Sequence, residues 1–464
     1  MASTYIYRNN DATAGGGYSS TWTWSGWVKR GTLGEQGLFM NRRIDHVSNS
    51  RMRFQFSSSD NLFIETKDST SNDDNYMETK MKFRDVNAWY HIVLAFDTTQ
   101  SNEIDRIKIW INNKSIETEL GGWNSPNRAG SGFGTLWSSA TRSMLGIATN
   151  NSNTDFMFNG SMSHVHFIYG TAYTPSAFGE TDATTGEWKI KTSPSVTYGS
   201  QGFFVLKDGN SATDQSGQSN NMTIDGGTLT KTEDCPSNVF ATLNSLYGNG
   251  NYTFANGNNS LEGNNGNNWG ITVPATLGAT SGKYYWEARQ VAGSHTDYNL
   301  FGFIQTDYNY TGSNLISTAY LNGIQTHTST VTVYNGANAT TYLKAGGSNI
   351  SVSDNDIVSF ALDLDNQKGW VAKNGVWSDD LSGNVGNPTT GANALWTSSV
   401  IPSGQMYAPV SIQYYDPKCQ YNFGNGYFGT TAVSSAGTNA SGIGIFEYDV
   451  PANFTALSTK GLNL

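Results

Sequence analysis

The amino-acid sequence predicts an all-β protein made of two antiparallel β-sandwiches joined by an irregular connector. Short apolar segments recur from end to end, mostly alternating and bounded by Gly, Asn, Asp or Ser, which is the pattern of sandwich strands. No window keeps the 3.6-residue apolar period of a helix. Charged residues make up only 14 % of the 464 residues. Ser, Thr, Asn and Gly must therefore cover the surface, and these residues disfavour helix.

The first part of the chain is expected to form one sandwich over residues 1–179. A polar turn separates residues 89–97 from residues 106–113, and together they predict a hairpin that ends on Asn112-Asn113. Asparagine tolerates the left-handed backbone conformation that tight hairpin turns require. The other strands of this part are expected at residues 21–30, 37–41, 51–56, 61–67, 143–148 and 160–170.

Residues 180–237 are expected to form a connector docked on the domains, because turn formers dominate there around one apolar run at residues 203–206. A second sandwich is expected over residues 238–430, and residues 431–464 are expected to form a C-terminal tail. The strands of the second sandwich are expected at residues 252–256, 270–276, 283–290, 299–305, 317–323, 329–336, 341–345, 357–377 (a hairpin), 407–415 and 420–425.

Motifs of the first part resemble a known sandwich family. SGWVKR, WYHIVLAFDTTQ…DRIKIWINN and LGIATNN…FNGSMSHVHFIYG are similar to a concanavalin A-like jelly roll of the laminin-G or pentraxin type. The resemblance covers residues 3–179, and the order of the pieces matches as well as their content.

Motifs of the second part resemble a different sandwich family. SGKYYWEARQ, LFGFIQ, NDIVSFALDLDNQKGWVAKNGVW and YAPVSIQYY…CQYNFGNGYF are similar to a SPRY/B30.2 domain over residues 238–428. The Tyr-Tyr-Trp-Glu strand and the Asp-Leu-Asp…Lys-Asn-Gly hairpin are the specific parts of this likeness.

The segment that joins the two expected sandwiches carries a third resemblance. TPSAFGETDATTGEWKIK, SATDQSGQSNNM and CPSNVFATLN resemble tandem proteins of marine tailed bacteriophages, which pair the same two sandwiches. The resemblance implies a virion structural protein, a tail fibre or appendage that attaches to the host through a surface glycan. It also implies other virion proteins as partners and a homo-oligomer, since phage fibres are usually trimers. Capsid decoration, as in a head fibre, is the alternative within this class.

Composition argues against several other functions. The net charge is −10 and no long Lys/Arg cluster occurs, so we expect no nucleic-acid binding. No segment approaches the ~20 apolar residues that cross a bilayer, so we expect no membrane insertion. The N-terminal segment MASTYIYRNN lacks the basic and apolar regions of a signal peptide.

The acidic residues give no convincing glycosidase site, so we expect no enzyme. Glycan hydrolysis needs two carboxylates held about 5–10 Å apart. Glu103 with Asp105 and Glu447 with Asp449 are the nearest candidates, and neither pair has a third carboxylate at the right spacing. A glycan-degrading enzyme of the concanavalin A-like fold remains the alternative from a different class.

Calcium is the only cofactor that the sequence suggests. Oxygen ligands occur at Asp208, Asn210 and Asp214 in DGNSATDQSG, although the loop departs from an EF-hand, and Asp155 is a further candidate. Asn/Asp turns explain the same residues without a metal. His164 and His166 are spaced to share a strand face, but no further Cys or His lies near them to complete a zinc site. Pairing between Cys235 and Cys419 stays open.

Aromatic residues in turn-rich stretches are the candidates for ligand binding. A sugar site usually sets an aromatic face under the ring and fixes the hydroxyl groups with Asn, Asp and backbone groups. The candidates are Trp123, Asn124, Trp137, Trp269 and Trp396. The competing interpretation is that these side chains pack in a core or in a subunit interface.

Overall fold

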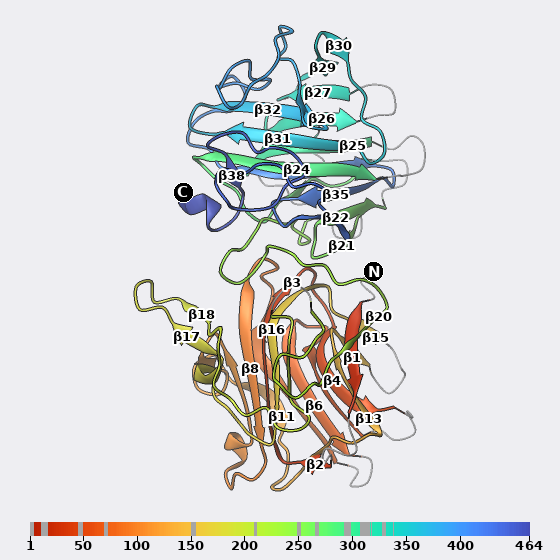
Figure 1. The fold of residues 1–464 in the computed structure, drawn as a ribbon, viewed down its shortest axis with the longest axis vertical. Helices are drawn as coiled ribbons and strands as arrows, with labels where there is room; N and C mark the ends of the chain where they lie inside the picture. Colours follow the sequence, from red (N-terminus) through yellow and green to blue (C-terminus); the bar gives the residue numbers. More distant parts are fainter. Residues whose placement is uncertain are drawn as a thin grey trace. The chain divides into compact units, whose positions relative to one another are not determined.

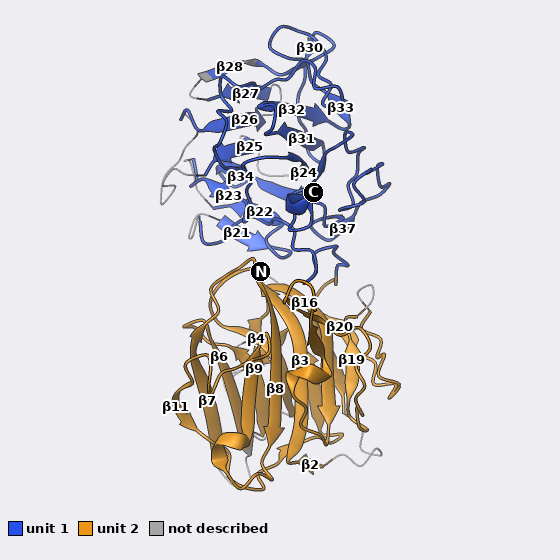
Figure 2. Cartoon of the chain, turned by 90° about the vertical axis from the view of Figure 1, so that its left-hand side faces the viewer, with its two compact units in different colours: residues 1, 230–464 blue, residues 2–229 orange. Residues whose placement is uncertain are grey.

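Two compact units make up the chain. The computed structural model describes residues 4–10, 17–44, 50–68, 73–149, 155–207, 211–247, 252–264, 269–291, 298–306, 316, 318–326, 331–336 and 338–464. The first unit comprises residues 2–229 and the second unit residues 230–464, and Figure 2 shows them in orange and blue. Each unit holds two large sheets of mainly antiparallel strands (Figure 1), which confirms the predicted all-β sandwich class. None of the described helices is long and apolar enough to cross a membrane.

The described residues of the first unit form an eight-stranded sheet and a six-stranded sheet. The order in the larger sheet is β11 (Trp123–Asn127), β7 (Asp73–Lys82), β6 (Asn61–Asp68), β5 (Arg51–Phe56), β4 (Gln36–Arg43), β13 (Thr141–Leu145), β1 (Tyr5–Asn9) and β20 (Thr223–Asp225). The order in the smaller sheet is β10 (Lys114–Ser115), β9 (Ile107–Ile111), β8 (Trp89–Asp97), β3 (Thr21–Arg30), β16 (Gly160–Tyr169) and β19 (Phe203–Val205).

Short elements complete the first unit. Three two-stranded ribbons pair β2 (Tyr18–Ser19) with β12 (Thr135–Leu136), β14 (Ile147–Thr149) with β15 (Asp155–Met157), and β17 (Gly179–Thr181) with β18 (Trp188–Ile190). The 3-10 turns of this unit are η1 (Glu103–Asp105) and η2 (Pro175–Ala177).

The core of the first unit lies between its two large sheets. Trp22 and Trp24 of β3 both have no exposed surface, because alternate residues of a strand share one face. Trp22 stacks on Phe96 of β8 with ring centroids 4.9 Å apart, and Trp24 meets Phe54 of β5 at 5.5 Å. Full burial of a large apolar side chain stabilises a fold by about 1.5–3 kcal/mol, so this aromatic layer holds the two sheets together.

Residues 180–229 belong to the first unit and complete both of its sheets, whereas we expected them to form a connector. β19 pairs with β16 in the smaller sheet, and β20 pairs with β1 in the larger one. Tyr198 and Phe204 also cover the outer face of the smaller sheet, where they pack with Val93 and Ile168. That face is therefore apolar and buried rather than open to solvent.

The second unit repeats the arrangement with an eight-stranded and a six-stranded sheet in the described residues. The larger sheet contains β21 (Tyr252–Ala255), β22 (Ser260–Gly263), β35 (Lys418–Asn422), β24 (Lys283–Val291), β31 (Ile357–Asp363), β32 (Lys368–Lys373) and β33 (Val376–Trp377), with β38 (Thr455–Ala456) joined to β24. The smaller sheet contains β23 (Val273–Pro274), β34 (Tyr407–Tyr414), β25 (Tyr298–Gln305), β26 (Leu321–Thr326), β27 (Val331–Asn335) and β28 (Asn338–Tyr342). The short elements are β29 (Lys344–Ala345), β30 (Ser348–Asn349), β36 (Tyr427–Phe428), β37 (Thr431–Ala432) and η3 (Gly461–Asn463).

Residues 431–464 form part of the second sandwich, although we expected only a tail there. Phe446 meets Tyr285 of β24 edge-on at 4.9 Å, and Phe454 meets Trp370 of β32 at 6.3 Å. β38 pairs with β24 in parallel. This C-terminal segment therefore covers the outer face of the larger sheet and supplies it with a strand.

Candidate functional site

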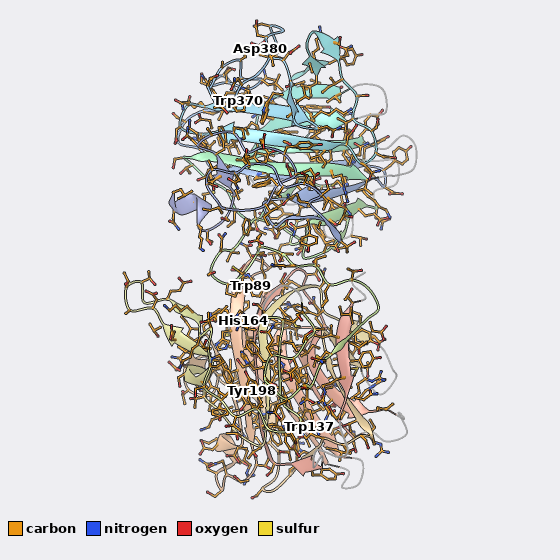
Figure 3. The ribbon with its side chains drawn as sticks, in the orientation of Figure 1. Trp89, Trp137, His164, Tyr198, Trp370 and Asp380 are labelled. Atoms are coloured by element: carbon orange, nitrogen blue, oxygen red, sulfur yellow. The ribbon has the colours of Figure 1, made fainter. Side chains whose placement is uncertain are left out.

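Three of the four tryptophans that we expected to bind a ligand lie in the cores. Trp137 and Trp396 have no exposed surface, and Trp123 is only 7 % exposed. Trp137 lies inside the first unit (Figure 3), with its ring 4.5 Å from that of Phe167. The indole N–H of Trp396 donates to the carbonyl of Tyr334 at 2.8 Å. A sugar cannot stack on rings enclosed in this way, so the prediction is wrong for these three residues.

Trp269 and Asn124 are the two remaining candidates, and both reach the surface. Trp269 is half-buried and forms an aromatic cluster with Tyr414 at 5.2 Å and Tyr298 at 5.9 Å. Asn124 is exposed on β11, where its Nδ2 donates to the carbonyl of Thr79 at 3.2 Å. The two residues belong to different units, so each stays a separate prediction.

Asp214 holds a loop together through hydrogen bonds, which corrects its assignment as a calcium ligand. Its Oδ1 accepts from the backbone N–H groups of Phe204 and Ser216, at 2.8 and 2.9 Å. Its Oδ2 accepts from the hydroxyl of Ser216 and from the backbone N–H of Asn220, both at 2.8 Å. Both carboxylate oxygens are therefore engaged by donors from within the protein.

The other calcium candidates do not gather into a site. Asp208 and Asn210 lie outside the described residues. Asp155 is exposed and lies in a pocket lined by arginines, where a metal cation would be repelled. Among the residues whose placement is described, no three His, Cys, Asp or Glu side chains come close enough to hold a metal ion. Cys235 and Cys419 are both free thiols.

Replacing Asp214 with alanine is expected to lower the free energy of unfolding by about 1–3 kcal/mol, because buried backbone donors lose their acceptor. The loss should be the same in EDTA and in calcium. Urea unfolding in the two buffers measures it, with the exposed Thr213→Ala as the control. A stabilisation by calcium that disappears in the Asp214 variant would contradict the assignment.

Three of the acidic candidates for hydrolysis, Asp105, Glu447 and Asp449, have a local structural partner. Asp105 forms an ion pair with Lys108 at 2.8 Å. Glu447 accepts hydrogen bonds from the backbone and the hydroxyl of Ser434, and Asp449 accepts from Thr438 in the same way. These acids thus stabilise turns of the chain.

His164 and His166 of β16 lie close together, because both imidazole rings contact Phe204, with ring centroids 5.9 and 3.9 Å away. A β-bulge shifts the register between Ser163 and His166, and His164 has a left-handed φ of 49°. His166 is buried, stacks on Phe204 at 3.9 Å, and its Nδ1 shares a hydrogen bond with the Tyr198 hydroxyl at 2.9 Å. The two imidazoles thus lie near each other in spite of the bulge, and among the described residues no third ligand joins them in a metal site.

A buried Ser–His pair in the first unit was not expected from the sequence. The Oγ of Ser25 lies 2.9 Å from Nε2 of His91, and the indole N–H of Trp188 donates to Nδ1 at 2.9 Å. An indole can only donate, so Nδ1 is the acceptor and the neutral ring carries its proton on Nε2. Burial lowers the pKa of His91 to about 3, with a further contribution from His164, and keeps the ring neutral. Nε2 therefore donates to Ser25 and cannot remove its proton, so the pair is not an activated nucleophile.

A basic pocket is the clearest candidate site of the described residues. It has a volume of about 110 Å³ and lies on the outer face of the larger sheet of the first unit. We call it the arginine pocket. Its lining includes Tyr5, Arg42, Arg43, Arg142, Met144 and Asp155.

Strand alternation places the polar and apolar parts of the arginine pocket side by side. β1, β13 and β4 are neighbours in the sheet, and Arg142 of β13 is directly opposite Arg42 of β4. Met144 is two residues from Arg142 and Met40 two residues from Arg42, so these side chains share the outer face. An apolar floor thus adjoins two guanidinium groups.

The two guanidinium groups are held by neighbouring side chains. Arg42 donates from Nη1 to the Thr149 hydroxyl at 2.5 Å. Arg142 donates from Nε to Oδ1 of Asn9 at 2.9 Å, and its guanidinium lies 4.2 Å from the ring centre of Tyr7. Burial lowers the pKa of Arg42, and the charge of Arg142 lowers it further against the opposing effect of Asp155. The arrangement is a positively charged cavity suited to one oxyanion.

Sequence inspection missed the arginine pocket because its residues are far apart in the chain. Arg42 and Arg142 come from strands separated by about a hundred residues, and the pair Arg42-Arg43 is too short to stand out as a basic cluster. The available signal was the spacing of arginine and methionine within each strand, Met40 with Arg42 and Arg142 with Met144. That signal identifies a shared face but not the pairing of the two strands.

Comparisons with known proteins show limited similarity. No family model and no curated protein matches the chain. Among solved structures, the chain is similar to the SPRY domain of human HERC1, with a TM-score of 0.27 and 16 % identity over 37 % of this chain and 91 % of that chain. It is also similar to the TRIM65 PSpry domain, with a TM-score of 0.27 and 11 % identity over 39 % of this chain and 91 % of that chain. Similarity at this level carries no conclusion about function.

Proposed function

We propose that this chain is a non-enzymatic bacteriophage virion protein, a tail fibre or appendage that adheres to the host by binding a surface glycan. The observation that supports binding is the arginine pocket, a charged cavity on the outer face of a sheet in a chain of net charge −10. The virion assignment depends on the resemblance of the joining segment to tandem phage proteins. The proposal includes other virion proteins as partners and a homo-oligomeric, trimeric assembly.

Virions purified through a density gradient are expected to contain this protein. Mass spectrometry of the gradient fractions should detect its peptides in the fraction that carries infectivity. Peptides confined to the soluble lysate would contradict the virion assignment. A lysate of uninfected host cells is the control.

Fluorescently labelled protein is expected to bind host cells and not isolated capsids. Cells stripped of surface polysaccharide should lose the signal if a glycan is the ligand. Binding to capsids without binding to cells would overturn adhesion and indicate capsid decoration.

Incubation with host polysaccharide is expected to release no reducing ends, and the Glu103→Gln variant should behave like the unmodified chain. Glu103 lies in the turn η1, where the neighbouring Asp105 forms a local ion pair. Release of reducing ends that the variant abolishes would contradict the non-enzymatic proposal.

A further inference from the structure

We propose that the arginine pocket binds the single carboxylate or sulfate group of an acidic saccharide, with Arg42 and Arg142 as the residues that contact the anion. The saccharide part of this inference rests on the proposed adhesion function. The anion part rests on the geometry of the pocket alone.

Two like charges are directly opposite each other on neighbouring strands of the pocket. Arg142 and Arg42 are register partners on neighbouring strands, and both side chains line the same cavity. Like charges in this position destabilise a sheet, and violations of such local rules are expected at functional sites. Asp155 offsets part of this repulsion at Arg42, and an oxyanion between the two guanidinium groups would add a second negative charge that both of them contact.

The size of the cavity limits the ligand group that it can hold. Ligand pockets for drug-sized molecules have volumes of about 300–1,000 Å³. The arginine pocket, at about 110 Å³, has room for one charged group and not for a whole oligosaccharide. Guanidinium groups match the planar carboxylate and the sulfate geometrically, because each presents several N–H donors in a fixed fork.

An apolar and aromatic surface lies beside the charges. Met144 and Tyr5 line the pocket next to Arg142. The hydroxyl of Tyr5 donates to Oδ2 of Asp225 at 2.7 Å, which fixes the orientation of its ring. A sugar ring carries apolar C–H faces, so a saccharide can place its acid between the arginines and a ring face on this surface. Free inorganic anions would contact only the guanidinium groups and not this apolar surface.

The carboxylate of Asp155 lies in the same pocket and raises the pKa of Arg42. A variant without this carboxylate can therefore test whether the pocket binds an anion. A bound anion must tolerate this negative charge. Removing the charge should therefore tighten binding, an effect that a purely structural role for the arginines would not produce.

The experiment is isothermal titration of the full chain, at low ionic strength, with glucuronate, glucose 6-sulfate, glucose and sodium sulfate. Glucuronate or glucose 6-sulfate should bind, while glucose should not. Sodium sulfate should bind at least tenfold more weakly than the better acidic sugar. Equal affinity for sodium sulfate would mean an adventitious ion only and would overturn the saccharide part.

Variants test the assignment of the residues. Arg42→Gln with Arg142→Gln should weaken binding of the better acidic sugar at least tenfold, since charge-assisted hydrogen bonds to the anion are lost. Lys108→Gln with Lys114→Gln removes the same charge from the β9–β10 region of the other sheet and should leave binding unchanged. Asp155→Asn should tighten it severalfold. Equal losses in both double variants, or no gain in Asp155→Asn, would overturn the site.

Cell binding separates this inference from the proposed function. Loss of host-cell binding in the Arg42→Gln/Arg142→Gln chain supports both. Cell binding that persists in that chain would leave adhesion standing and overturn the pocket as its site. Acidic sugars that bind the purified chain while no host cell does would leave the anion site standing and overturn adhesion.

Discussion

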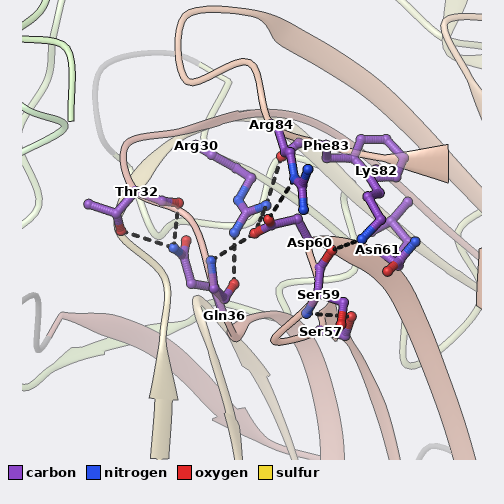
Figure 4. A network of polar contacts seen from close by, with 12 residues as sticks. Arg30, Thr32, Gln36, Ser57, Ser59, Asp60, Asn61, Lys82, Phe83 and Arg84 are labelled. Atoms are coloured by element: carbon purple, nitrogen blue, oxygen red, sulfur yellow. Dashed lines mark hydrogen bonds and ion pairs between the residues drawn. The ribbon is translucent and has the colours of Figure 1, made fainter. Parts of the chain in front are cut away.

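Replacing Asp60 with asparagine is expected to destabilise the first unit by about 3–5 kcal/mol, because the change leaves Arg30 as a buried charge without its counter-ion. The side chain of Arg30 is fully buried and that of Asp60 is 8 % exposed. Figure 4 shows the network around them: Oδ1 of Asp60 accepts from Nη1 of Arg30 at 3.2 Å and from the backbone N–H of Gly34 at 2.9 Å, and Oδ2 accepts from Arg84 at 3.1 Å. Asparagine suits the test because Asp60 has a left-handed φ of 68°, which asparagine tolerates.

Hydrogen exchange followed by mass spectrometry measures this loss, since its peptides report on each unit separately. The control is Arg84→Gln. The side chain of Arg84 is 58 % exposed, so its ion pair with Asp60 should contribute at most about 1 kcal/mol. Equal effects of the two variants would contradict the view that the buried charge of Arg30 dominates.

The same network predicts that the stability of the first unit depends on pH. Burial by itself would raise the pKa of Asp60, but hydrogen bonds from Gly34 and Arg84 and the charge of Arg30 outweigh it and lower the pKa below the usual 3.8. The unfolded chain therefore binds this proton at a higher pH than the native chain. The contribution of Asp60 is fully present above pH 3.8 and is lost as the pH falls through the lowered pKa.

Above about pH 7, where its carboxyl is ionised, replacing Glu287 with glutamine is expected to destabilise the second unit by about 2–6 kcal/mol, because two buried donors lose their acceptor at about 1–3 kcal/mol each. Glu287 lies on β24 and has no exposed surface. Its Oε1 accepts from the Tyr285 hydroxyl at 3.0 Å and the Tyr448 backbone at 2.9 Å. Its Oε2 accepts from Nδ2 of Asn422 at 3.1 Å and the Glu447 backbone at 2.9 Å. A glutamine would present an NH₂ group to one of these donor pairs.

Because two of the four donors belong to the C-terminal segment, the Glu287 variant should also loosen that segment. Limited proteolysis is expected to cut residues 431–464 faster in Glu287→Gln than in the unmodified chain. Asp449→Asn is the matched control, since Asp449 is an exposed acid of the same segment that accepts only from Thr438. Unchanged proteolysis in Glu287→Gln would show that the buried carboxyl does not anchor the segment.

Glu287 should also give the second unit a pH dependence of the opposite sign to that of Asp60. Burial raises the pKa of Glu287 from 4.5 to about 7, against the hydrogen bonds that favour its ionised form. Between these values the native chain holds a proton that the unfolded chain has lost, so stability falls as the pH rises. The fall should total about 3 kcal/mol, be complete above about pH 7, and be absent in Glu287→Gln. Parallel pH profiles for the two chains would contradict this assignment.

The hairpins show what the sequence could predict. Asn374 and Gly375 have φ of 48° and 80°, and Asn112 and Asn113 have φ of 48° and 68°, as tight hairpin turns require. The expected strand Trp89–Asp97 forms with those bounds, and the hairpin expected over residues 357–377 contains β31, β32 and β33. Turn chemistry and alternation are local properties, so they can be recognised without knowledge of the rest of the fold.

The burial of a side chain by distant segments of the chain could not be predicted in the same way. Trp137 stands in GTLWSS, where Gly and Ser suggested a surface loop, but the short pairing of β12 with β2 turns this segment toward the core. The arginine pocket likewise depends on which strands become neighbours. Contacts between distant segments are set by the tertiary fold, and the local pattern around each residue does not contain them.

The parallel pairing of β38 with β24 affects the order in which the chain can fold during synthesis. Every described strand of the first unit has been translated by residue 225, so this unit can fold while translation continues. In the second unit, Tyr284 and Tyr285 must wait about 170 residues for their partners Thr455 and Ala456. At a translation rate of ~5–20 residues per second, this edge of β24 stays without its partner strand for roughly 10–30 s. We expect ribosome-associated chaperones to be crosslinked mainly to nascent chains that end between residues 290 and 455.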